Sequence, residues 1–411
     1  EAVTRQMQII RGQLPAVLRR FKRIADPRNP RKLKHKLSSL LLYGILLFAL
    51  HMISRRQANR ELASPQIEAN LRALLPDLDR IAHADTLYRL LRDLGDNVQQ
   101  IEQALVALVR ALIRSKRLSQ YLINNCYPIA IDGTRKFNAN APWADELQQQ
   151  RRRAKPHEGL IEDDDEAGEY HYHAYVLEAS LCLHNGMVIP LMSEFLDATQ
   201  GDTRTQKQDC ELRAFERLAK RLNEALPRLP VMLMLDGLYA KGPVMYLCEQ
   251  LNWQYMIVLK DACLPSVWAE YESLQRLQTR NTHQQQWGQR EQHFRWVNDI
   301  EYCYKHQARE RALTVHVVVC EEQWQVLDET GERVTKRSRH AWLSSRRLNR
   351  HNLHTRCNLG ARHRWGIEAG FLVAKRQGYA YEHVFAEHWA AMRGYHYLMR
   401  LGQMLNTLAR F

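Results

Sequence analysis

The spacing of apolar and polar positions divides the chain into a helical first part and a mixed second part. From residue 1 to roughly 120, apolar residues recur at steps of three and four, as in Leu87, Leu90, Leu91 and Leu94. This spacing places them on one face of a helix. The longest apolar run, Leu40 to Ile53, has about 14 residues, whereas a helix that spans a bilayer needs roughly 20. We expect a helical region here and no membrane partner.

From Tyr127 onward, short apolar runs bounded by turn residues predict strands. Asn185-Gly186 stands between two such runs and is a strong hairpin signal. The predicted strands are 129–131, 170–183, 187–195, 231–235 and 255–260, and the predicted helices between the later strands are 209–226 and 239–251. The order is β-β-β-α-β-α-β, typical of an α/β core in which the first and fourth strands are neighbours. Residues 264–345 then break the alternation and predict an inserted β-rich domain.

Charge and cysteine usage narrow the class of protein. The chain has 59 Lys and Arg against 45 Asp and Glu, a formal charge of +14, which attracts polyanions such as nucleic acid. A cluster around Pro30, formed by Arg31, Lys32, Lys34 and Lys36, is either a phosphate-binding surface or a solvated helix face. The eight cysteines form no C-x-x-C pair, which favours a reducing cytoplasm. The sequence contains no phosphate-binding loop of the GxxxxGK type, which argues against an ATP-driven enzyme.

Two carboxylates carry the first chemical signal. Asp132 and Asp236 each follow an apolar strand and precede a Gly. If the first and fourth strands are neighbours, these two anions lie side by side and repel unless a cation separates them. Mg²⁺ suits such a pair because it prefers oxygen ligands and needs few from the protein. The alternative for each residue is an Asp that caps the following turn.

A third carboxylate, Glu368, stands four residues after Arg364 and seven before Lys375. These steps are close to whole helical turns, so the three side chains share a helix face. A plain i,i+4 salt bridge is the alternative. Farther upstream, His351, His354 and Cys357 lack the paired spacings of a zinc site. With Arg356 and Arg362 they are interpreted as a basic, DNA-facing surface.

At these residues the sequence resembles the insertion-sequence transposases of the DDE class, in the subgroup with a Tyr-x2-Arg-x3-Glu-x6-Lys signature. Arg364, Glu368 and Lys375 fit its last three places, while Ala361 occupies the place of the Tyr. The resemblance covers roughly residues 120–400 and implies an RNase H-like core. The domains are then 1–120, a helical DNA-binding region; 121–263, the first part of the core; 264–345, the β-rich insertion; and 346–411, the second part of the core with the C-terminal helices.

The resemblance also implies a function. Asp132, Asp236 and Glu368 would hold two Mg²⁺ ions, or Mn²⁺ as substitute, for phosphoryl transfer. Arg364 and Lys375 would contact phosphates, and a Trp of the insertion, for which we choose Trp296, would stack on a flipped base. Arg135 and Lys136 complete the candidates for DNA binding. The partners would be double-stranded DNA with terminal inverted repeats and a target DNA, bound by a homodimer in a bacterial cytoplasm.

Two other functions stay open at this point. One is a stand-alone metal-dependent nuclease of the same fold, which cuts DNA without joining it to a target. The other is a catalytically inactive DNA-binding derivative of a transposase. The presence of all three carboxylates argues against the inactive derivative, and the β-rich insertion argues against the simple nuclease.

Overall fold

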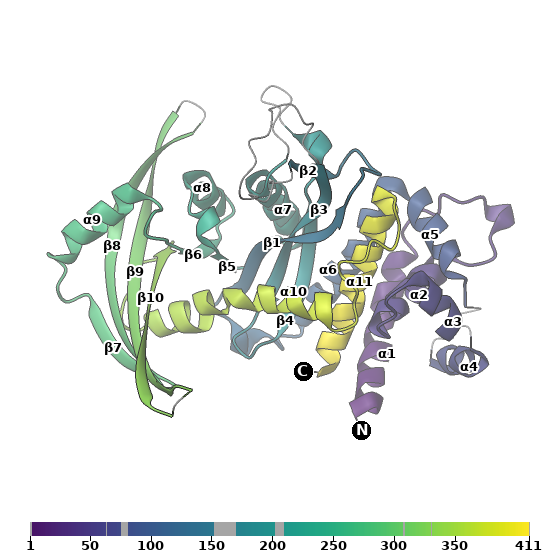
Figure 1. Cartoon of the computed structure of the whole chain (residues 1–411), viewed down its shortest axis with the longest axis horizontal. Coiled ribbons are helices and arrows are strands. Elements are labelled where there is room, and N and C mark those ends of the chain that lie inside the picture. Colours follow the sequence, from purple (N-terminus) through teal and green to yellow (C-terminus); the bar gives the residue numbers. More distant parts are fainter. Residues whose placement is uncertain are drawn as a thin grey trace, which may run out of the picture.

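The computed structural model describes residues 2–62, 64–74, 81–151, 170–201, 209–306, 309–329 and 331–410. Within these residues the fold is mixed α/β, with a group of helices at one end and a large mixed sheet extending to the other (Figure 1). The strands are β1 (Tyr127–Ala139), β2 (Gln148–Arg151), β3 (Tyr170–Cys182), β4 (Val188–Phe195), β5 (Val231–Leu235), β6 (Gln254–Val258), β7 (Thr282–Trp287), β8 (Arg290–His306), β9 (Arg309–Leu327) and β10 (Arg333–Ser344).

The strands form one sheet in the order β2-β3-β1-β5-β6-β10-β9-β8-β7, with β4 also paired to β3. β5 runs parallel to β1 and to β6, while β1 with β3, β3 with β4 and β6 with β10 are antiparallel. The predicted order of strands and the pairing of the first with the fourth are confirmed, with the short β2 in addition. The expectation that the first strand ends at Asp132 was wrong, because β3 continues to pair with β1 as far as Ala139.

Residues of β1 and β5 alternate between two cores, as the two-residue period of a strand requires. Ile129 and Leu233 belong to the larger core, which also contains Phe215. Ala130 and Met232 belong to a second core on the opposite face. The helices α7 (Glu211–Ala225) and α8 (Gly242–Gln250) contribute to the larger core, and η7 (Ala361–Trp365) and α10 (Gly366–Arg376) to the second. A strand buried on both faces explains why 231–235 is entirely apolar.

The hairpin predicted from Asn185-Gly186 joins β3 to β4. Gly186 has a φ of 87°, a left-handed conformation that costs Gly little. The backbone N–H of Met187 donates to Oδ1 of Asn185 at 3.0 Å, which stabilises the turn. The predicted hairpin is therefore confirmed, and both residues of the Asn-Gly pair stabilise its turn.

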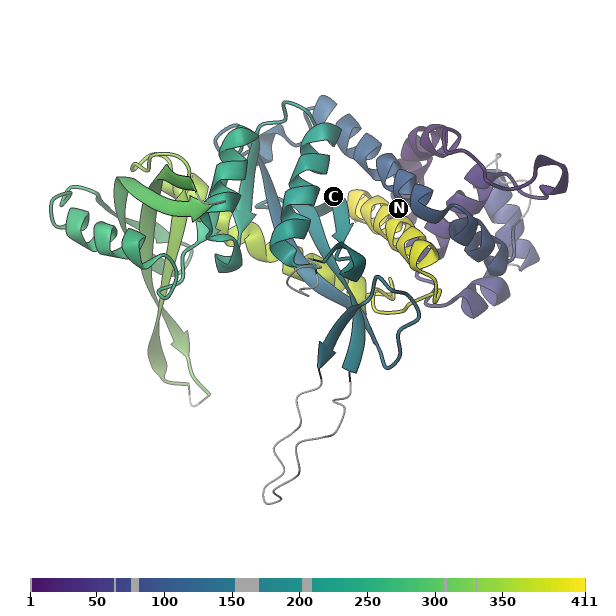
Figure 2. The ribbon, with the colours of Figure 1, turned by 90° about the horizontal axis from the view of Figure 1, so that it is seen from above.

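The predicted helical character of the first 120 residues is confirmed as well. The elements are α1 (Ala2–Phe21), η1 (Pro30–Lys32), α2 (Leu37–Ala49), α3 (Arg55–Glu61), α4 (Pro65–Leu74), α5 (Ala84–Asp93), η2 (Gly95–Ile101) and α6 (Glu102–Arg114), followed by η3 (Ser119–Tyr121). The final helix, α11 (Trp389–Arg410), lies among them (Figure 2). Asn406 of α11 donates its side-chain amide to the carbonyl oxygen of Ala49 at 3.1 Å. The C-terminal helix is thus packed against the N-terminal region.

Residues 264–345 are β-rich, as predicted. They contain α9 (Pro265–Gln275) and strands β7 to β10. β10 pairs with β6 through Trp342 with Val258 and Leu343 with Ile257, so these strands extend the central sheet. The remaining short elements of the chain are η4 (Ala198–Gln200), η5 (Gly237–Tyr239) and η6 (His354–Gly360), the last a π-helix. In the part of the chain that the structure describes, no helix combines the length and apolarity needed to cross a bilayer.

The close approach of α11 to α2 generates a stability prediction at Gly402. A Cβ at this position would lie 3.0 Å from the backbone nitrogen of Ala49 and 3.0 Å from Cβ of Phe48. We expect Gly402→Ala to lower the free energy of unfolding by about 1–3 kcal/mol, because the helices must separate. Gly12→Ala is the matched control, since nothing lies within 4 Å of the added methyl. Urea denaturation should show the control unchanged or up to about 1 kcal/mol more stable; equal losses in both variants would contradict the packing argument.

Candidate active site

Asp132 and Asp236 lie at the same edge of the parallel part of the sheet, just beyond the last residues at which β1 and β5 pair. The last parallel pair of β1 with β5 is Ala130 with Met234. Each Asp follows its member of this pair by two residues, so the two stand level with each other. Ligands bind at this edge in α/β sheets. Asp236 also caps η5, since its Oδ1 accepts a hydrogen bond from the backbone N–H of Leu238 at 2.9 Å. The turn-capping role that was the alternative for this residue is therefore present.

Arg364 links the first Asp to the candidate Glu. Arg364 lies in η7, and Glu368 lies in the first turn of α10. The guanidinium of Arg364 is 3.6 Å from Oδ2 of Asp132 and 3.0 Å from Oε1 of Glu368. The Arg364 side chain is only 8% exposed, whereas those of Asp132 and Glu368 are 22% and 37% exposed. The i,i+4 ion pair, which was the alternative interpretation of this spacing, is present, and Arg364 also contacts Asp132 of β1.

The electrostatic environment of Asp132 includes the charges of the other two candidate carboxylates. The pKa of Asp132 is raised to about 6, chiefly by burial and in addition by the negative charges of Glu368 and Asp236. The N–H of Gly133 and the charge of Arg364 act in the opposite direction. A carboxyl with such a pKa binds or releases a proton near neutral pH.

A fourth carboxylate, Glu211 in the first turn of α7, lies beside this group. The hydroxyl of Tyr175 donates to Oε1 of Glu211, and the hydroxyl of Tyr239 approaches Oε2 at 3.5 Å. A Cβ on Gly133 would lie 2.6 Å from Oε1 of Glu211 and 2.5 Å from Cε1 of Tyr175. A larger residue at position 133 would therefore have to displace the side chains of Tyr175 and Glu211.

The residues fit a hard divalent cation in chemical kind, because carboxylate oxygens are the ligands that Mg²⁺ prefers. Within the described residues, however, no three Asp, Glu, His or Cys side chains are gathered closely enough to hold a metal ion. Arg364 provides the positive charge between Asp132 and Glu368 instead. Binding of a metal ion would require this guanidinium to move.

The other candidates for DNA binding divide into exposed and buried residues. Arg31, Lys32, Lys34 and Lys36 are exposed around η1. Arg135 is exposed on β1 and donates to Gln150 at 2.8 Å. Lys375 pairs with Glu382 at 3.0 Å, with a side chain 22% exposed.

Lys136 and Trp296 are buried, and neither lies on a DNA-facing surface. The ammonium of Lys136 donates to the carbonyl oxygen of Tyr381 at 2.9 Å, and its residue is 3% exposed. Trp296 is 4% exposed and packs in the second core with Val318 and Trp342, which favours a structural role.

Two surface assignments from the sequence also need revision. Arg356 is 1% exposed and Arg362 pairs with buried Glu322, so the expected DNA-facing surface does not include them. In contrast, Trp365 was missed by sequence reasoning and is 65% exposed beside Arg364. Its position next to the signature Arg was the available signal.

A comparison with known proteins bears on the helical region. Residues 18–109 match the sequence model of the family described as DDE_Tnp_1-associated. This stretch runs from the end of α1 into α6 and contains none of the three candidate carboxylates. The match relates the chain to DDE-type transposases. No curated protein matches the chain.

The raised pKa of Asp132 predicts a pH dependence of stability. An unfolded Asp titrates near 3.9, so between about pH 4 and pH 6 the native state binds more protons, and stability falls as pH rises. Asp132→Asn removes this loss. We expect the variant to exceed the wild type in stability by on the order of 1–3 kcal/mol above pH 6, with no such gain below pH 4. Urea denaturation in chelator-treated buffer measures this, and a difference that is independent of pH would show the assignment to be wrong.

Proposed function

We propose that this protein is a DDE transposase that cleaves DNA at the ends of a mobile element and joins the freed ends to a target DNA. The observation that carries the proposal is the grouping of Asp132 and Asp236 at one sheet edge, with Arg364 connecting Asp132 to Glu368. The match of residues 18–109 to a transposase-associated family supports it. The formal charge of +14 supports a polyanionic substrate.

The arrangement of strands supports an RNase H-like core as part of this proposal. The antiparallel strands β4, β3 and β1 are followed in the sheet by β5 and β6, which run parallel to β1. Such a core would bring Asp132 of β1 and Asp236, which follows β5, near η7 and α10, the elements that carry Arg364 and Glu368. The β-rich strands extend the sheet on the far side of β6.

The chemistry follows from the side chains present. Asp132, Asp236 and Glu368 would hold two Mg²⁺ ions, which would activate an attacking water or 3′-OH and stabilise the leaving oxygen. Arg364 and Lys375 would bind phosphate oxygens next to the cleaved bond. Trp365 offers an exposed ring to the bases of the same DNA segment. The exposed cations Arg31, Lys32, Lys34 and Lys36 would hold the duplex through its phosphates, with Arg135 as a further contact.

The partner set is a duplex with terminal inverted repeats, a target DNA and a second copy of the chain. A stand-alone nuclease of the same fold is the second candidate, favoured by the same carboxylates. A strand-transfer assay on the DNA that flanks the coding region separates the two. A protein that nicks this DNA but never joins a 3′-OH to a target is the nuclease.

Removal of one central carboxylate should abolish cleavage. We expect Asp236→Asn to lower the rate of Mg²⁺-dependent cleavage by at least about 100-fold, since a charged oxygen ligand is lost. Asp261→Asn is the matched control, because the side chain of Asp261 is 81% exposed and its ion-pair partner is Arg339 of β10. Gel assays of end cleavage measure both variants. Activity of Asp236→Asn equal to that of the control would remove Asp236 from the site.

Arg364 should oppose metal binding while it supports cleavage. Its guanidinium lies between two carboxylates, so Arg364→Gln removes a competing cation. We expect roughly three- to tenfold tighter Mn²⁺ binding without DNA, together with slower cleavage because a phosphate contact is lost. Isothermal titration against Arg376→Gln, an exposed Arg on the same helix, provides the control. Weaker Mn²⁺ binding by Arg364→Gln would show that Arg364 assists the metal.

A further inference from the structure

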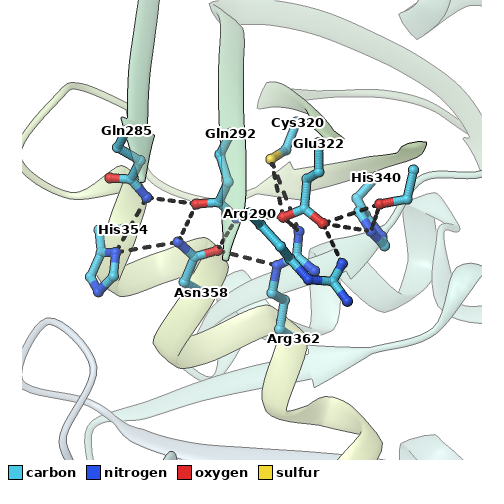
Figure 3. A network of polar contacts seen from close by, with 10 residues as sticks. Gln285, Arg290, Gln292, Cys320, Glu322, His340, His354, Asn358 and Arg362 are labelled. Carbon is cyan, nitrogen blue, oxygen red and sulfur yellow. Dashed lines mark hydrogen bonds and ion pairs between the residues drawn. The ribbon is translucent and has the colours of Figure 1, made fainter. Parts of the chain in front are cut away.

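The segment that leads into α10 is attached to one strand after another of the sheet. Arg356 donates to Oε1 of Gln254 on β6 at 2.7 Å. Asn358 exchanges two side-chain amide hydrogen bonds with Gln292 on β8, at 2.8 and 3.0 Å. Arg362 donates to Glu322 on β9. The π-helix η6 and the short helix η7 are thus held to the β-rich half of the sheet by buried polar contacts (Figure 3).

Glu322 is the centre of these contacts. Its side chain is 0% exposed, which is unusual for a carboxylate unless it is paired. Besides Arg362, its oxygens contact the guanidinium of Arg290 at 2.8 Å, the hydroxyl of Ser338 at 3.1 Å and the ring of His340 at 3.6 Å. Burial works against the charge of Glu322, yet the hydrogen bonds of His340 and Gln292 and the charge of Arg362 hold its pKa well below the usual range.

Arg362 has little freedom to leave this position. Its guanidinium lies 5.0 Å from the ring centre of Trp287 and 5.6 Å from that of Trp342. Its Nε donates to Oδ1 of Asn358 at 3.2 Å. Figure 3 shows Arg362 and Asn358 pointing from their helices toward the strands that carry Glu322 and Gln292. The end of η7 nearest the β-rich strands is therefore fixed.

The other end of η7 carries Arg364, two residues later, which faces Asp132 of β1 and Glu368. A 3₁₀-helix rises about 2 Å per residue, so the two Arg residues are separated by roughly 4 Å along its axis. A displacement of η7 by about 1 Å would change both contacts of Arg364, and displacements of this size reduce catalysis substantially.

We propose that Glu322 is a positioning residue for the candidate site: through Arg362 it fixes η7, and η7 sets where Arg364 and Glu368 stand relative to Asp132. The inference rests on the proposed function for its catalytic consequence, although the positioning itself is a property of the metal-free protein. It gives the β-rich strands a role in the site that their distance from the carboxylates does not suggest.

The test compares Glu322→Gln with Glu102→Gln. Glu102 is a matched control because it is also a buried carboxylate paired with an Arg, Arg221, but it lies on α6 and contacts β4. Hydrogen exchange of the full-length, metal-free protein is measured first. We expect Glu322→Gln to raise exchange by at least about tenfold in residues 354–368, and Glu102→Gln to leave this segment unchanged.

Cleavage kinetics supply the second measurement. The Mg²⁺ concentration at half-maximal rate should rise by about tenfold in Glu322→Gln and stay constant in Glu102→Gln, even where both lose similar thermal stability. Arg362→Lys, which keeps the charge but loses the contact to Asn358, should give a smaller change in the same direction, and it carries the test if Glu322→Gln does not fold. The pair Glu322→Gln with Arg362→Gln should be less than additive.

Unchanged exchange in residues 354–368, or an increase spread evenly over the chain, would overturn the positioning role. Increased local exchange with an unaltered Mg²⁺ requirement would overturn its connection to the site. If the wild type itself neither cuts DNA nor binds Mn²⁺, the proposed function fails, and the exchange measurement still decides whether Glu322 fixes η7.

Discussion

The parallel pairing of β1 with β5 is the constraint on which the candidate site depends. Its register places Asp132 and Asp236 level with each other at one edge, and no contact between their side chains is needed to bring them there. The other groups at the site offset the repulsion between carboxylates that are partly buried and close together. Arg364 compensates Asp132 and Glu368, and two tyrosine hydroxyls approach Glu211. Backbone pairing thus sets the positions of the two Asp residues, and the neighbouring polar groups compensate the resulting negative charge.

Local patterns predicted the strands, the hairpin and the helical first part because each is determined by periodicity and turn chemistry within about ten residues. Local patterns did not predict the burial of Lys136. A bulge between Arg135 and Phe137 shifts the register of β1, so Lys136 and Phe137 are both buried and the simple alternation is lost. They also failed to find the burial of Trp296, whose partners come from other strands.

For the site, the Asp-Gly pairs and the Arg-x3-Glu spacing indicated the residues that the structure brings into one region. Metal binding and catalysis stay predictions. Glu211 and Glu322 were not found as site residues, since their contacts are long-range: Tyr175 precedes Glu211 by 36 positions, and Arg362 follows Glu322 by 40. A single sequence carries no local signal for an ion pair of this kind, because only the folded sheet brings the partners together.

The pairing of β10 with β6 has a consequence for exchanging the β-rich segment between related chains. Trp342 faces the second core and Leu343 the larger one, in register with Val258 and Ile257. A transplanted segment that enters this seam one residue out of step would turn its apolar side chains to the wrong faces and move the Glu322 anchor with them. Whether a transplanted segment is compatible therefore depends on its register at the junction, where a shift of an odd number of residues reverses the faces, as much as on sequence similarity. Chimeras should be aligned on the pairing of β6 with β10.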